Sequence, residues 1–193
     1  LVGDSVVENA SGVLIGTLFA TDPDGIDTII YSLPNADSSF TIIGNQLFIA
    51  SGRSFDFELD STIQLTIRAS DSGSPPLFLD KTIQIKVQDI NEFAPGFRPV
   101  TFRVPENSPA LAAVGTLFAT DGDSADRVRY RFIGPTPTNF SLNPETGRVS
   151  LNTGTTLDFE RNDSYQFFVE AYDSGLPQLA TTSSVNVEVV DVN

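Results

Sequence analysis

Apolar and polar residues alternate along much of the chain. The pattern is plain in four segments: TIQLTIRAS at 62–70, KTIQIKVQD at 81–89, YQFFVEAYD at 165–173 and SSVNVEVVD at 183–191. A period of two in segments rich in Val, Ile, Thr and aromatic residues predicts half-buried β-strands. Turn sequences such as DPDG and NPETG separate the strands, and no long 3.6-residue period predicts a helix.

Four segments of the first half return in the second half in the same order. VVENASGVLIGTLFATDPD at 6–24 returns as VPENSPALAAVGTLFATDGD at 104–123, FDFE at 55–58 as LDFE at 157–160, ASDSGSPPL at 69–77 as AYDSGLPQL at 171–179, and VQDIN at 87–91 as VVDVN at 189–193. The offset grows only from 98 residues (6 to 104) to 102 residues (87 to 189). The chain therefore consists of two copies of one domain.

Each copy has the length and the pattern of a β-sandwich. About seven short strands in roughly 95 residues are typical of two antiparallel sheets packed face to face, and a domain of this size can bury its own core. We therefore predict an all-β fold of two tandem seven-stranded sandwiches, at residues 1–91 and 92–193. A short linker at about 89–95 joins them, and we expect the chain to end within the equivalent of the next linker.

The charge of the chain indicates a cation as its small partner. The 193 residues include 25 acidic and 11 basic side chains, for a formal net charge of -14, with no histidine and no cysteine. Nucleic acid and anionic lipid are disfavoured as partners because binding them needs clustered Lys and Arg. The remaining metal ligands are oxygen atoms, which favour hard ions such as calcium. No apolar run reaches the roughly 18 residues of a membrane span.

Acidic residues gather where predicted strands end or loops begin. Glu8, the Asp56 and Glu58 pair, and Asp89 all occupy such positions in the first copy. Alternate residues of an extended segment point the same way, so Asp-x-Asp and Asp-x-Glu can direct two carboxylates at one ion. Without a cation, two such charges ~4 Å apart repel by ~4 kcal/mol at an effective dielectric near 20. These residues predict a calcium site that draws ligands from both copies.

The ordered set of motifs resembles the extracellular repeat of the cadherin superfamily, over the whole chain and twice. VVEN resembles the family's x-Glu-x element, FDFE its Asp-Arg-Glu element, DINEFAP its Asp-x-Asn-Asp-Asn-x-Pro linker, TDGD its Asp-x-Asp element and AYDSG the element with the last aspartate. The likeness is closer to non-classical members with long arrays than to classical cadherins, whose strand exchange uses a tryptophan that is absent here. It implies Greek-key sandwiches in a rod, with about three calcium ions at each junction.

The resemblance also implies a set of ligands for three ions at the central junction. The outer ion would take Glu8, Asp56, Glu58 and Glu92. The middle ion would share Glu8, Glu58 and Glu92 and add Asp89, the Ile90 carbonyl and Asp123. The third ion would take Asn91, Asp121, Asp123 and Asp173, with backbone carbonyls near Phe93 and Asp126. Asp123 would thus bridge two ions.

Two of these positions depart from the family pattern. Glu92 stands where aspartate is usual, which keeps the charge and lengthens the side chain by one methylene. Phe93 replaces an asparagine, at a position for which the resemblance requires only a carbonyl. Partial sites are expected at both ends of the chain, one from Asp22, Asp24, Asp27 and Asp71, and the other from Glu106, Asp158, Glu160, Asp191 and Asn193.

Taken singly, the same residues have plainer interpretations. Asp121 and Asp173 are common turn formers, and Glu8 alone would be a solvated strand end. Phe19 and Phe118, in the repeated GTLFATD, are interpreted as packing residues of the core rather than as binding residues. N-x-Ser sequons, which are compatible with glycosylation, begin at Asn9, Asn139 and Asn162.

The favoured function is that of a segment of a calcium-dependent adhesion protein, in the extracellular part of a cell-surface membrane protein. Calcium would stiffen a rod-like ectodomain, and the full ectodomain would make homophilic or heterophilic contacts of the cadherin type. The alternative is a calcium-dependent carbohydrate- or matrix-binding module of a secreted or microbial surface protein. An enzyme is disfavoured, because glycoside hydrolysis needs one acid kept protonated in an apolar pocket, whereas these acids cluster with other acids.

Overall fold

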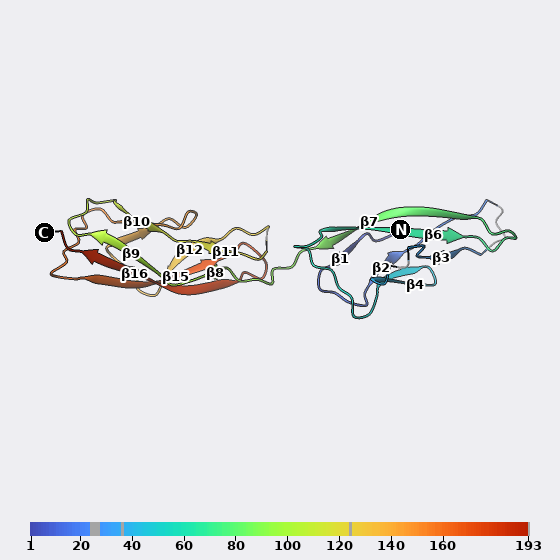
Figure 1. Cartoon of the computed structure of the whole chain (residues 1–193), viewed down its shortest axis with the longest axis horizontal. Coiled ribbons are helices and arrows are strands. Elements are labelled where there is room, and N and C mark those ends of the chain that lie inside the picture. The colour runs from blue at the N-terminus through green and yellow to red at the C-terminus, as the bar shows by residue number, and fades with distance from the viewer. Residues whose placement is uncertain (24–27, 36, 124, 193) are drawn as a thin grey trace. The chain divides into compact units, whose positions relative to one another are not determined.

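The computed structural model divides the chain into two compact units, Leu1–Ile90 and Asn91–Asn193 (Figure 1). It describes residues 1–23, 28–35, 37–123 and 125–192, so the predicted partial-site residues Asp24, Asp27 and Asn193 lie outside the described residues. Both units are built from strands, and the described part of the chain contains no helix, hence none that could cross a bilayer. The predicted all-β fold of two tandem sandwiches is confirmed. The predicted division between residues 91 and 92 stays a prediction.

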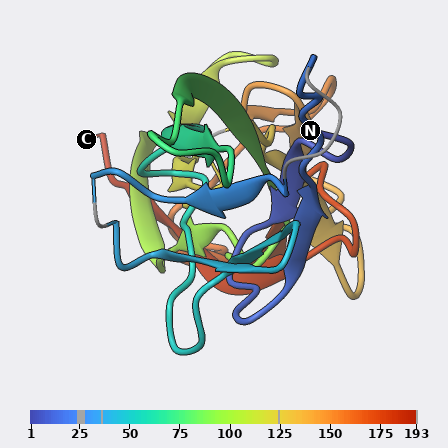
Figure 2. The same cartoon turned by 90° about the vertical axis from the view of Figure 1, so that its right-hand side faces the viewer.

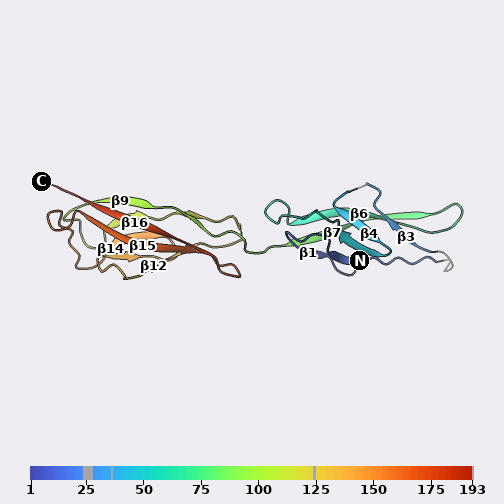
Figure 3. The same ribbon diagram turned by 90° about the horizontal axis from the view of Figure 1, so that it is seen from below.

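The first unit is a sandwich of a four-stranded and a three-stranded sheet, which Figures 2 and 3 show from two further sides. The sheet orders are β1-β7-β6-β3 and β2-β5-β4, and β1 runs parallel to β7. The strands are β1 (Ser5–Val7), β2 (Leu14–Thr17), β3 (Ile30–Ser32), β4 (Phe40–Ile43), β5 (Gln46–Ile49), β6 (Thr62–Ser70) and β7 (Phe78–Gln88).

The second unit repeats this plan and adds a short pair of strands. Its sheets have the orders β12-β15-β16-β9 and β10-β14-β13, and β8 pairs with β11. As in the first unit, the first strand of the larger sheet, β9, runs parallel to the last, β16. The strands are β8 (Gly96–Phe97), β9 (Val100–Pro105), β10 (Ala113–Thr116), β11 (Ala119–Thr120), β12 (Arg129–Ile133), β13 (Phe140–Leu142), β14 (Arg148–Leu151), β15 (Ser164–Tyr172) and β16 (Ala180–Val190).

The alternation of apolar and polar residues in the sequence matches an alternation of buried and outward-facing side chains along the strands. In β16, Val185, Val187 and Val189 are buried while their neighbours face outward. In β6, Leu65 and Ile67 are buried in the same way. Each set faces the core of its unit, where apolar side chains of both sheets meet. The period of two therefore encodes which face of each sheet is covered.

A bulge at the same place in both copies requires glycine. The pairing register shifts between Leu14 and Gly16, and again between Ala113 and Gly115. A Cβ atom on Gly16 would overlap the Val2 carbonyl oxygen, and one on Gly115 would overlap the Phe102 ring. The glycine that begins the repeated GTLFATD is thus needed for the close approach of neighbouring chain segments.

The bulge also overturns one prediction, that Phe19 and Phe118 are core residues. Both are exposed, at 68% and 77%, whereas the preceding Leu18 and Leu117 are buried. The regular strands end one residue before each leucine, at Thr17 and Thr116. Because the bulge breaks the alternation, the leucine turns inward and the phenylalanine that follows it faces solvent.

Substitutions of the adjacent residues Leu117 and Phe118 should therefore differ widely in their effect on the stability of the second unit. We expect Leu117→Ala to lower the free energy of unfolding of the second unit by about 2–5 kcal/mol, because it leaves a cavity in a closed core. Phe118→Ala should change it by no more than about 0.5 kcal/mol, as for other exposed positions. Denaturant unfolding followed by circular dichroism measures both, and equal losses would contradict the outward orientation of Phe118.

Candidate metal centre

The carboxylate of Glu8 fastens two distant segments of the first unit. Glu8 lies directly after β1 and is only 2% exposed. Its Oε2 atom accepts a hydrogen bond from the Phe57 N–H at 2.9 Å, and its Oε1 atom accepts one from the Ile90 N–H at 2.8 Å. Hydrogen bonds to a charged acceptor contribute about 1.5–3 kcal/mol each. Glu8 therefore holds the Asp-Phe-Glu turn and the end of the unit in place.

An asparagine turns the chain directly after Glu8, and another does so after Glu106, the equivalent residue of the second unit. Asn9 and Asn107 have φ values of 59° and 58°, in the left-handed region that asparagine tolerates better than most residues. Their N–H groups donate to Phe55 O at 2.9 Å and to Leu157 O at 3.0 Å. The repeated Glu-Asn pair is thus a carboxylate followed by the turn that positions it.

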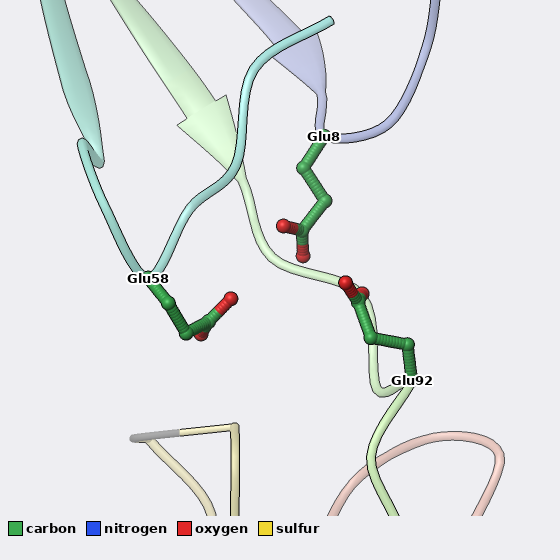
Figure 4. Close-up of side chains that lie close together, drawn as sticks. All are labelled: Glu8, Glu58 and Glu92. Carbon is green, nitrogen blue, oxygen red and sulfur yellow. The ribbon is translucent and has the colours of Figure 1, made fainter.

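Glu58 has close carboxylate neighbours within the first unit, Glu8 and Asp89. A carboxylate oxygen of Glu58 lies within 4.8 Å of a carboxylate oxygen of Glu8. A carboxylate oxygen of Glu58 also lies within 4.8 Å of a carboxylate oxygen of Asp89. Figure 4 shows the Glu8 and Glu58 carboxylates turned toward one another; it also labels Glu92, which belongs to the second unit. Asp56 Oδ1 accepts the N–H of Glu58 at 3.0 Å and so shapes the turn. These spacings suit a shared divalent cation.

In the second unit, Asn91 and Asp173 form a hydrogen-bonded pair. Asp173 is 1% exposed and accepts the N–H groups of Gly175 and Leu179 at 3.1 Å each. The Asn91 Nδ2 atom donates to Asp173 Oδ2 at 3.0 Å and to Pro177 O at 2.6 Å. With its nitrogen fixed in this way, the Asn91 Oδ1 atom is buried and has no hydrogen-bond partner.

The Asp-Gly-Asp loop shows the same division between a bonded oxygen and an unpaired one. Asp121 Oδ1 accepts the Asp123 N–H at 3.1 Å, and Asp123 Oδ2 accepts the Phe93 N–H at 2.9 Å. The other oxygens, Asp121 Oδ2 and Asp123 Oδ1, are buried without partners. A buried carboxylate oxygen without a partner costs free energy, so it marks a place for a cation. Asn91, Asp121 and Asp123 of the second unit each offer one such oxygen, of the type that a hard metal ion accepts as a ligand.

The electrostatics of Asp121 agree with this fit. Burial raises the pKa of its carboxyl group above the usual value of 3.8; the Asp123 N–H opposes the shift, and the charges of Asp123, Asp173 and Asp126 add to it. Like charges disfavour the ionised form of a carboxyl group, and a cation bound nearby favours it. The cluster thus has the charge to attract a divalent ion and little means of its own to neutralise that charge.

Phe93 does more in this loop than offer a carbonyl. Its N–H holds Asp123, and a Cβ atom on Gly122 would overlap its ring. Asp126 likewise acts through its side chain, since its Oδ1 atom accepts the Ser174 hydroxyl at 2.9 Å. Sequence reasoning did not find these roles, and the glycine between the two aspartates was the only signal of the close approach.

The predicted partial sites have related geometry. At the far end of the second unit, oxygens of Glu106, Asp158 and Glu160 lie within 4.8 Å of one another. The Val192 and Phe159 N–H groups lower the pKa of Glu106, which accepts both as Glu8 does in the first unit. In the first unit, Asp71 and Asp22 line one cavity of about 360 Å³.

The family profile described as the cadherin domain matches residues 5–88 and again residues 100–190. The chain belongs to the cadherin family. Cadherin domains are adhesion modules without enzymatic activity, so the prediction of a non-enzyme is confirmed. The family binds calcium at the linkers between its domains, and the acidic clusters of both units are of the kind that such binding needs.

The curated relatives include protocadherins, which are non-classical cadherins. Protocadherin-20 of Mus musculus is 31% identical over 96% of this chain and 20% of the relative. Protocadherin-11 X-linked of Sus scrofa is 32% identical over 98% of this chain and 17% of the relative. The chain spans about a fifth of the length of these relatives. The predicted likeness to a non-classical member is confirmed.

Solved structures agree with these relatives. The mouse clustered PcdhgC3 EC1-3 structure matches with a TM-score of 0.80 and 25% identity, over 98% of this chain and 65% of that chain. Mouse Cadherin-23 EC22-24 matches with a TM-score of 0.78 and 28% identity, over 98% and 63%. The two units are extracellular cadherin repeats of the kind that cell-surface proteins carry, which confirms the predicted location.

Proposed function

We propose that this chain is a segment of a calcium-dependent adhesion ectodomain in which calcium stiffens the junction between the two repeats. The observation that carries the proposal is the trio of buried oxygens without partners, Asn91 Oδ1, Asp121 Oδ2 and Asp123 Oδ1. Each belongs to a side chain whose other polar atom is fixed by a hydrogen bond. Carboxylate and amide oxygens are the ligands that a hard cation such as calcium prefers.

The proposed ligands fall into two groups, one from each unit. The first unit would supply Glu8, Asp56, Glu58, Asp89 and the Ile90 carbonyl, and the second would supply Asn91, Glu92, Asp121, Asp123 and Asp173, with carbonyls near Phe93 and Asp126. About three ions would share them. Support comes from the fit of each group taken by itself and from the linker calcium sites of the family.

Calcium binding would stiffen the junction because it stabilises the calcium-bound form, by an amount that depends on the calcium concentration. Extracellular calcium modules bind with dissociation constants of about 10⁻⁴ to 10⁻³ M. A ligand at about ten times its dissociation constant stabilises the bound form by ~1.4 kcal/mol per site. Several sites filled together would convert a repelling cluster of acids into a stiff joint, while each sandwich keeps its own core.

Small-angle scattering with and without calcium tests the function. We expect chelation to change the scattering profile and the spread of interdomain distances, because the acidic groups then repel, while the circular dichroism of the strands stays the same. The Asp123→Asn variant in calcium should resemble the chelated protein. Identical profiles with and without calcium would overturn the proposal of a calcium-stiffened junction.

Contacts with other cadherin chains, homophilic or heterophilic, are the proposed use of the stiffened segment. The family makes such contacts, which is the support for extending them to the protein that contains this chain. Analytical ultracentrifugation in millimolar calcium separates an adhesive segment, which would dimerise with increasing concentration, from a spacer, which would stay monomeric.

A further inference from the structure

Two of the three sequon asparagines lie around one cavity of the second unit. Asn139 immediately precedes β13, and Asn162 lies in the loop that leads into β15. The cavity has a volume of about 340 Å³ and is lined by Asn139, Thr156, Asp158, Arg161, Asn162 and Tyr165. The lining combines one aromatic ring with amide, hydroxyl and charged groups. Such a mixture suits a sugar, which offers both an apolar face and many hydroxyl groups.

We propose that Asn139 is N-glycosylated and that the first N-acetylglucosamine of its glycan lies in this cavity against Tyr165. Asn139 is half-buried, and among the described residues no hydrogen bond engages its Nδ2 atom, the atom that carries an N-glycan. Asn152 holds the backbone on either side, since its Nδ2 atom donates to Thr138 O at 2.7 Å and to Phe140 O at 3.2 Å. The folded unit therefore holds Asn139 at the rim of the cavity, and no hydrogen bond of its Nδ2 atom has to be given up to accommodate a glycan that is already attached.

The covalent step needs an activated sugar, supplied as a lipid diphosphate-linked oligosaccharide. The Asn139 Nδ2 atom bonds to the anomeric carbon, and the carbon–oxygen bond to the diphosphate breaks. Its electron pair leaves with the lipid diphosphate, and one amide proton passes to a base of the transferase. An extracellular repeat passes through the compartment where this transfer takes place.

Transfer to Asn139 must precede folding of the second unit. Phe140, the middle residue of the sequon, is 2% exposed, and Ser141 is paired with Ser150 in the β13–β14 ladder. A transferase that reads Asn, the next residue and the serine together cannot grasp a segment whose middle side chain is in the core. The folded chain should therefore accept no glycan at Asn139.

At Asn162, the middle residue of the sequon engages the serine hydroxyl that the transferase must recognise. The Ser164 hydroxyl, which the sequon must present, donates to Asp163 Oδ1 at 2.9 Å, and this contact between adjacent residues is open to the unfolded chain as well. In the folded unit the Asn162 Nδ2 atom donates to Tyr165 Oη at 3.4 Å. Asn162 is thus a wall of the cavity, whereas Asn139 is the point of attachment.

Attachment beside the cavity makes a weak sugar site effective. A single sugar ring on one aromatic side chain binds loosely from solution, but a short tether supplies an effective concentration in the millimolar range or above. The Tyr165 ring is itself held edge-on against Phe140, with centroids 5.4 Å apart, so it forms a fixed platform.

Peptide mapping by mass spectrometry of the chain secreted from a glycosylating eukaryotic host tests the attachment. We expect a glycan on Asn139 in most molecules, its loss in Ser141→Ala, and no loss from Asn139 in Ser164→Ala. Both serines are exposed, so both variants should fold, and a co-secreted reporter glycoprotein shows that the host is competent. An unmodified Asn139 beside a modified reporter overturns the proposal, as does modification of Asn162 in its place.

Nuclear magnetic resonance of the wild-type glycoprotein tests the location of the sugar. The N-acetyl methyl signal of the first sugar should shift upfield because of the Tyr165 ring current, and should return to its ordinary position when the chain is denatured. Tyr165→Phe keeps the ring and should keep the shift. A methyl signal at the same position in the folded and denatured chain would overturn the docking in the cavity.

Discussion

Replacing Asp123 with asparagine is expected to weaken calcium binding by at least about tenfold. One Asp123 oxygen is fixed by the Phe93 N–H and the other is buried without a partner, so asparagine can keep the hydrogen bond while it removes the charge. A unit charge ~4 Å away at an effective dielectric near 20 contributes ~4 kcal/mol, and a third of that, about 1.4 kcal/mol, is already tenfold in affinity. Calorimetric titration with calcium measures the change.

The matched control is Asp22→Asn in the first unit. Asp22 also belongs to a cluster of acids, but the sequence predicts only part of a site there. Its loss should therefore change the measured affinity of the chain by less than about twofold. Equal losses from the two variants would contradict the central role of Asp123. Thermal unfolding of both variants in chelator separates a lost ligand from a lost fold.

Replacing Glu8 with alanine is expected to destabilise the first unit even when calcium is absent. The Glu8 carboxylate accepts the N–H groups of Phe57 and Ile90, and both donors would lose their partner in the variant. At about 1.5 kcal/mol or more for each bond, the loss is about 3 kcal/mol, which lowers the melting temperature of a domain of this size by more than about 10 °C. Calorimetric melting in chelator measures this loss apart from any loss of metal.

Asp4→Ala is the control for Glu8→Ala. Asp4 lies four residues earlier in the same unit, and its exposed carboxylate is 4.0 Å from the Lys86 ammonium group. An ion pair of this kind contributes at most about 1 kcal/mol, so the melting temperature should change little. If the two variants melt together, Glu8 serves only as a metal ligand and does not fasten the Asp-Phe-Glu turn.

Local patterns in the sequence predicted most of the fold. The period of two found β6, β7, β15 and β16, because each strand alternates between one covered face and one open face. The prediction failed for Phe19 and Phe118, since a bulge reverses the alternation just before them and no local signal other than a glycine marks it.

The sequence predicted which residues form the candidate site, but not which oxygen atom of each side chain is hydrogen-bonded to the backbone. Motif order pointed to Asp121, Asp123 and Asp173, but not to the oxygen of each aspartate that a backbone N–H would occupy. The same holds for the Phe93 ring, which lies on Gly122 in a way that no spacing of acids predicts.

The sequence alone predicted two copies of one β-sandwich, a resemblance to a family of calcium-binding repeats, and a set of oxygen ligands for a metal ion. These conclusions depend on periodicity, repetition and residue type, which are properties of short segments. Only the tertiary structure decided that Glu8 meets the Ile90 N–H, 82 positions away, that Phe19 faces solvent, and that Asn139 and Asn162 share one cavity. The pairing of β1 with β7 brings Glu8 to Ile90, the bulge in β2 turns Phe19 outward, and segments 23 residues apart in the chain meet at the cavity. These features depend on strand pairing, bulges and packing, which residue type and periodicity do not specify.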